Sequence, residues 1–150
     1  MNRILADVPF LGWFTSSRGE GELALTEGIV EERLFTGARG RYDVAGTYPI
    51  SGITRIDVRP SLVGIFLLLL AIACVPASLY WNDPWFAYGA WGFWTLAHRY
   101  NRVIVMKTTI VTIKRTIEDQ PRAERFKDAV LRALADYRTH HCNAGHEVLR

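Results

Sequence analysis

Hydrophobic residues are concentrated in one central stretch of the chain, whereas the sequence on either side mixes apolar and charged positions. Residues 61–98 contain a single charged side chain, Asp83. Residues 62–80 form an uninterrupted apolar run, and a polar step at residues 81–84 separates it from an aromatic-rich run over residues 84–98. Nineteen to twenty apolar residues match the thickness of a bilayer core. The pattern predicts a two-helix transmembrane hairpin over residues 61–98.

The two apolar runs differ in strength. Eleven residues of the first are Leu, Ile, Val or Phe, which favours insertion by about 3–7 kcal/mol. The alternative is a buried helix of a soluble protein, but such a helix normally carries a polar stripe, and this run has none. The second run is short, and its aromatic residues prefer the membrane interface. A tilted or re-entrant helix is therefore the alternative to a full crossing.

Basic residues flank the apolar block on both sides. Arg55 and Arg59 precede it, Arg99 and Arg102 follow it, and the connecting loop carries only Asp83. The positive-inside rule then predicts a multi-pass protein with both termini in the cytoplasm. These four arginines are the candidate residues for binding lipid headgroups or setting topology.

The flanking regions predict a small β domain divided by the apolar block. Residues 22–60 read as short strands separated by turns, after an interfacial segment over residues 1–21. Residues 99–138 contain two β-branched segments and an amphipathic helix over residues 121–138, whose apolar stripe includes Phe126, Val130 and Leu134. Neither half can bury a stable core alone. We therefore expect one antiparallel sheet, built from both halves and capped by the helix.

Three segments carry a resemblance to a known family. They are a strand with the pattern Tyr-x-Ile-x-x-Ile over residues 48–56, two strands over residues 102–114, and the helix over residues 126–137. Their order resembles a pleckstrin-homology-like domain. It is more similar to small bacterial membrane proteins of unknown function in which a transmembrane helical hairpin interrupts such a domain. The resemblance implies an α+β membrane protein of the bacterial inner membrane, with a binding or scaffolding role and no catalytic residues.

Charge and cysteine content narrow the choice of partners. The formal net charge of +3 comes from the C-terminal part, where residues 99–150 hold eleven Lys or Arg and six acids. This favours membrane lipids as partners, and no nucleic-acid recognition motif is visible. The two cysteines, Cys74 in the apolar run and Cys142 in the tail, do not form a disulfide framework.

Two further segments contain candidate site residues. The tail over residues 139–150 gathers donors that zinc accepts, namely His140, His141, Cys142 and His146. A solvated tail is the alternative. Near the N-terminus, Phe10, Trp13 and Phe14 form an apolar segment suited to a partner or to the membrane interface.

The leading functional hypothesis is a non-enzymatic, membrane-anchored interaction or scaffold module that uses no cofactor and binds a protein partner. One alternative is an accessory subunit or immunity-type inhibitor of a membrane-acting toxin. The other is a metal-binding sensor or enzyme that uses the C-terminal tail.

Overall fold

The computed structural model describes residues 4–10, 20–36 and 41–147. It contains seven strands and three α-helices within this part of the chain. Four strands, β1 (Ile4–Phe10), β2 (Gly21–Thr26), β3 (Ile29–Thr36) and β4 (Arg41–Pro49), form one antiparallel sheet in the order β1-β2-β3-β4. A second sheet contains β5 (Ile53–Pro60), β6 (Arg102–Thr108) and β7 (Thr112–Ile117) in that order.

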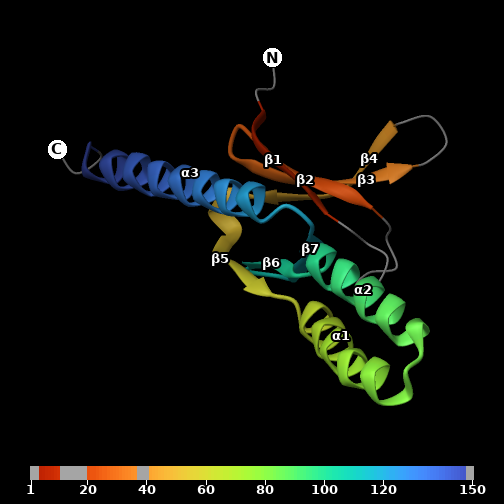
Figure 1. Ribbon diagram of the computed structural model, residues 1–150. Coiled ribbons are helices and arrows are strands. Elements are labelled where there is room, and N and C mark those ends of the chain that lie inside the picture. Colours follow the sequence, from red (N-terminus) through yellow and green to blue (C-terminus); the bar gives the residue numbers. More distant parts are fainter. Residues whose placement is uncertain (1–3, 11–19, 37–40, 148–150) are drawn as a thin grey trace.

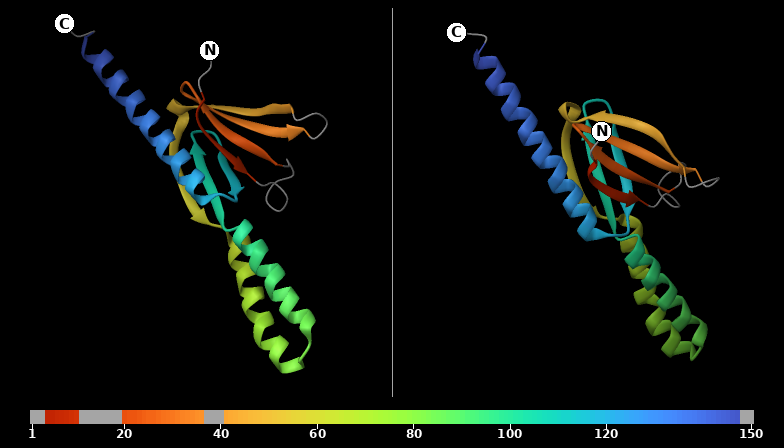
Figure 2. Two further views of the ribbon diagram at one scale, coloured as in Figure 1. Left: turned by 45° about the horizontal axis from the view of Figure 1, so that its top comes forward. Right: turned by 90° about the horizontal axis from the view of Figure 1, so that it is seen from above.

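The helices occupy two separate places (Figure 1). Helices α1 (Leu62–Trp81) and α2 (Pro84–Arg99) form a hairpin between β5 and β6 that projects away from the sheets. Helix α3 (Gln120–Glu147) lies across the sheets, and its C-terminal end points away from the hairpin (Figure 2). The chain is therefore an α+β domain with a projecting helical arm.

Local sequence signals explain the turns and helix ends. Glu27 and Gly28 both adopt positive φ angles between β2 and β3, as a two-residue hairpin turn requires. The Ser61 hydroxyl accepts a hydrogen bond from the Gly64 backbone N–H at the start of α1. Asn82 ends α1 in the left-handed conformation, which Asn tolerates better than most residues.

One hydrophobic core joins the two sheets and α3. Phe126 and Val130 of α3 are fully buried and belong to the same core cluster as Val8, Leu25 and Ile104, which come from β1, β2 and β6. The helix contacts β1, β2 and β5, and β1 also contacts β7. Halves of the domain that are far apart in sequence thus complete each other's core.

The structure corrects the predicted fold class. The strands form two sheets rather than one, because the chain turns at Ile50–Gly52 and β5 pairs with β6 instead of continuing along β4. The predicted two-helix transmembrane hairpin is also wrong. Among the described residues, only α1 is both long and apolar enough to cross a membrane. At 1.5 Å per residue, the 16 residues of α2 span about 24 Å, less than a bilayer core of about 30 Å.

Candidate functional site

The helical hairpin exposes large apolar side chains that a water-soluble surface normally buries. In α1 the exposed fraction is 60% for Phe66, 59% for Leu69 and 57% for Ile72, and it reaches 80% for Leu79. Only 11% of the most apolar 18-residue window of α1 is buried. A core helix of a soluble domain would be mostly buried, so α1 is not a core helix of this chain. Exposed apolar surface of this extent is typical of a site that binds another molecule or a membrane.

Helix α2 exposes aromatic rather than aliphatic side chains. Trp85, Tyr88, Trp91 and Trp94 are each between 58% and 76% exposed. At the tip, the Trp81 ring stacks on Phe86 with 5.3 Å between ring centroids. Trp and Tyr favour the interface between headgroups and hydrocarbon. The two helices therefore offer different surfaces, an aliphatic one on α1 and an interfacial one on α2.

The root of the hairpin is tightly joined to the domain. The Ser61 backbone N–H donates to the Asn101 carbonyl at 2.8 Å, which continues the pairing of β5 with β6 into the helices. A Cβ atom on Gly64 would lie only 2.7 Å from the Tyr100 carbonyl oxygen, so the absence of a side chain permits this approach. The chain thus leaves and re-enters the domain at adjacent points.

The predicted multi-pass topology is wrong for the same reason as the transmembrane hairpin. One candidate spanning helix among the described residues cannot provide two crossings. Since β5 and β6 are paired, both ends of the hairpin lie on the same side of whatever the hairpin enters. A single full crossing by α1 alone is therefore incompatible with the sheet.

Each of the four predicted arginines has a polar partner. Arg59, Arg99 and Arg102 lie near the hairpin root, whereas Arg55 lies toward the other end of β5. Arg55 and Arg59 both donate to the Asp57 carboxylate, at 2.7 and 2.9 Å. Arg99 pairs with Glu118 at 3.2 Å, and Arg102 donates to the Gln120 side chain at 3.1 Å. The hydrogen bond from Arg59, assisted by the charge of Arg55, lowers the pKa of Asp57. This carboxylate therefore stays ionised at neutral pH.

A buried polar cluster that the sequence patterns do not indicate connects the two sheets. Glu32 of β3 is completely buried and accepts hydrogen bonds from Arg115 of β7, with the Arg115 Nε at 2.8 Å. The Tyr48 hydroxyl donates to Glu32 at 3.2 Å, and the Arg115 guanidinium lies over the Phe10 ring at 5.2 Å. The pair links β3 of the first sheet to β7 of the second.

The remaining predicted site residues are placed as follows. Phe10 is only 2% exposed and packs in the core, so it is not available to a partner. Trp13 and Phe14 lie outside the described residues. Helix α3 continues to Glu147 and includes the predicted metal ligands, where His140 is exposed. The side chains of His141, Cys142 and His146 lie outside the described part, and the described residues contain no group of three metal-binding side chains.

A scan against protein-family models and a search of curated proteins found no match to this chain. The geometry of the hairpin and the domain is therefore the basis for a functional proposal.

Proposed function

We propose that this chain is a non-enzymatic interaction module that anchors to one face of a lipid bilayer through the α1–α2 hairpin without crossing it. The exposed aliphatic surface of α1 carries the proposal. Burying four such side chains in hydrocarbon, at about 1.5–3 kcal/mol each, is enough to hold a small domain on a membrane.

The layered chemistry of the hairpin supports insertion into one leaflet. Helix α1 has an aliphatic outer surface suited to acyl chains, and α2 covers one of its sides with an aromatic surface suited to the headgroup boundary. The connecting turn contains Asn82 and Asp83, and a charge held at the bilayer centre costs about 2.5–3.5 kcal/mol. A hairpin that lies obliquely places α1 among the acyl chains. It keeps α2 and the turn at the interface, where their side chains are favoured.

The domain supports a role in binding rather than catalysis. Its buried carboxylate, Glu32, bonds to the half-buried Arg115 of the other sheet and to Tyr48. Strand β4 lies at the end of the first sheet, where it pairs with β3 on one side. An edge strand of this kind can accept a strand from a partner protein.

The intrinsic tryptophans provide a direct test. Four of the five tryptophans, Trp81, Trp85, Trp91 and Trp94, lie in the hairpin or its turn. With Trp13 replaced by Phe, fluorescence therefore reports the hairpin alone. On dilution from mild detergent into neutral phosphatidylcholine vesicles, lipids brominated near the headgroup should quench this fluorescence more strongly than lipids brominated near the acyl-chain end.

Matched variants separate lipid binding from general hydrophobicity. Replacing Phe66, Leu69 and Ile72 of α1 by Ser should abolish vesicle binding. Replacing Leu131 of α3, which is 43% exposed, should leave binding unchanged. A chain that stays off the vesicles and instead buries its tryptophans in a stable dimer would contradict the proposal.

A further inference from the structure

The pairing register places a group of charged residues on the outer face of the β5-β6-β7 sheet. Arg55 pairs with Lys107, and Asp57 lies in register with Val105 and Lys114. The neighbouring row, Ile56, Met106 and Ile113, is buried in the core. Because successive residues of a strand point to opposite faces, the charged rows face away from α3.

This outer face is strongly basic. It carries four cations, Arg55, Arg59, Lys107 and Lys114, and one carboxylate, Asp57. The side chains of Arg55 and Arg59 are 60% and 53% exposed, and both lysines are exposed. Val103 and Val105 lie on the central strand β6, in the same rows as Arg59 and Asp57, and are half-buried. The result is an exposed basic face with an apolar centre.

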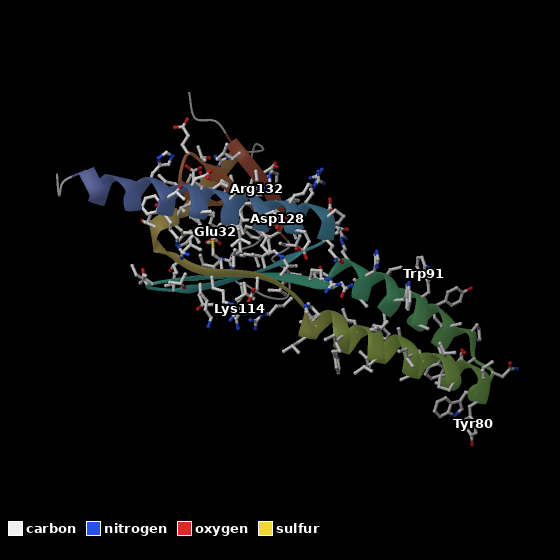
Figure 3. All side chains as sticks on the ribbon, turned by 90° about the vertical axis from the view of Figure 1, so that its left-hand side faces the viewer. Glu32, Tyr80, Trp91, Lys114, Asp128 and Arg132 are labelled. Carbon is white, nitrogen blue, oxygen red and sulfur yellow. The ribbon has the colours of Figure 1, made fainter. Side chains whose placement is uncertain are left out.

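The face and the hairpin are oriented toward the same side of the molecule. Figure 3 shows Lys114 below the sheet, on the side toward which the hairpin slopes to its tip near Tyr80. Asp128 and Arg132 of α3 lie on the opposite side of the sheet in the same view. Helix α1 is the lower helix in this view, so its aliphatic surface and the basic face lie on the same side of the molecule.

We propose that the outer face of β5, β6 and β7 binds the anionic headgroups of phospholipids and so orients the domain on the membrane. The inference builds on the hairpin anchor proposed above, because continuity with the hairpin selects a lipid surface as the anionic partner. The proposed headgroup site adds Lys107 and Lys114 to the arginines that the sequence indicates. Both lysines lie in the strands after the hairpin and join Arg55 and Arg59 through the sheet register alone.

The test compares two variants of equal net charge in the full chain. In the first, Lys107→Thr with Lys114→Thr removes two cations from the basic face and keeps residues that favour strands. In the second, Arg132→Gln with Arg138→Gln removes two exposed cations from α3 and keeps residues that favour helices. Flotation with vesicles of phosphatidylcholine alone, and with a fraction of phosphatidylglycerol added, measures the partition coefficient of each protein. Circular dichroism verifies that each variant is folded.

We expect the wild-type chain to bind anionic vesicles more tightly than neutral ones. The strand variant should lose about 10- to 30-fold in affinity for the anionic vesicles and nothing for the neutral ones. The helix variant should keep most of the preference. Raising the salt concentration should remove the preference of the wild-type chain, because surface charges are screened.

The outcomes distinguish this inference from the anchor on which it rests. Binding to neutral vesicles with no gain from anionic lipid, or an equal loss in both double variants, would overturn the headgroup site and leave the anchor intact. Absence of binding to neutral vesicles would reject the anchor, while a charge-dependent interaction lost only in the strand variant would still support the basic face. Tighter binding to a DNA duplex than to anionic vesicles at equal salt would overturn the lipid assignment.

Discussion

Helices α1 and α3 are the two long helices of this chain, and they relate to the core in opposite ways. Helix α3 is mixed in composition and places Ala123, Phe126 and Val130 completely inside the core. Helix α1 is almost entirely apolar, yet within it only Gly64 and Ala71 are buried. The most hydrophobic element is thus largely exposed. The contrast separates residues that form the core of the domain from apolar residues that the core leaves exposed.

Truncating one phenylalanine on each helix gives the largest expected difference. Phe126→Ala removes a fully buried ring and should lower the free energy of unfolding by about 3–5 kcal/mol. Phe66→Ala removes a ring that is 60% exposed and should change domain stability little while weakening vesicle binding. Urea unfolding of both variants in mild detergent, followed by circular dichroism, checks the pair. Equal destabilisation would mean that α1 belongs to the folding core.

The buried ion pair provides the next test on the domain side. Arg115→Met leaves the Glu32 carboxylate buried without its cation and should lower the free energy of unfolding by about 3 kcal/mol. Adding Glu32→Gln to this variant removes the uncompensated charge, so stability should recover in part. Arg125→Met, at an exposed position of α3, is the control. If the double variant were no more stable than Arg115→Met, the pair would not act as a unit.

Two glycines allow the packing at the root of the hairpin to be compared with the packing farther along it. Gly64→Ala places a Cβ atom against the backbone of Tyr100 and Asn101 and should cost about 1–3 kcal/mol. A Cβ atom at Gly92 meets nothing within 4 Å, so Gly92→Ala should be neutral or stabilise by up to about 1 kcal/mol. Hydrogen exchange at Ser61, whose backbone N–H bonds to Asn101, measures the effect. Faster exchange in both variants alike would contradict the tight root.

Removing the one acid of the basic face has the smallest expected effect. Asp57→Asn raises the net charge of the face by one and should tighten binding to anionic vesicles by about fivefold. Since the pKa of Asp57 is lowered, its charge does not change near neutral pH, and the gain should be constant between pH 6 and 8. Asp128→Asn on α3 should give a smaller gain in the same flotation assay. A loss of binding in Asp57→Asn would show that Asp57 positions the arginines rather than opposing them.

Local patterns predicted the helices better than they predicted how the strands combine. The apolar run and the Asn-Asp-Pro step indicate the two helices of the hairpin, because capping and helix-stop signals are local. The second run is visibly short in the sequence, but the prediction of two spanning helices gave this length too little weight. The aromatic side chains of α2 raise its hydrophobicity but favour the membrane interface. Composition alone therefore overstated its tendency to cross a bilayer.

Contacts between distant segments were beyond the sequence patterns. Nothing near Glu32 indicates that Arg115, 83 positions away, neutralises it in the core. Lys107 and Lys114 are visible as charges in the sequence, but their place on one face with Arg55 depends on the register of three strands. Register depends on which face of each strand is buried, and the imperfect alternation in β5 left that open.

The proposed hairpin anchor enters the bilayer from the side of the domain and returns to the same side. The direct measurement uses a chain with Cys74 and Cys142 replaced and a single cysteine at position 82 or at position 128. Protein bound to the outside of sealed vesicles is treated with a membrane-impermeant maleimide. The account predicts that both positions react before the vesicles are opened. Reaction at position 128 alone, with position 82 labelled only after permeabilisation, would contradict it.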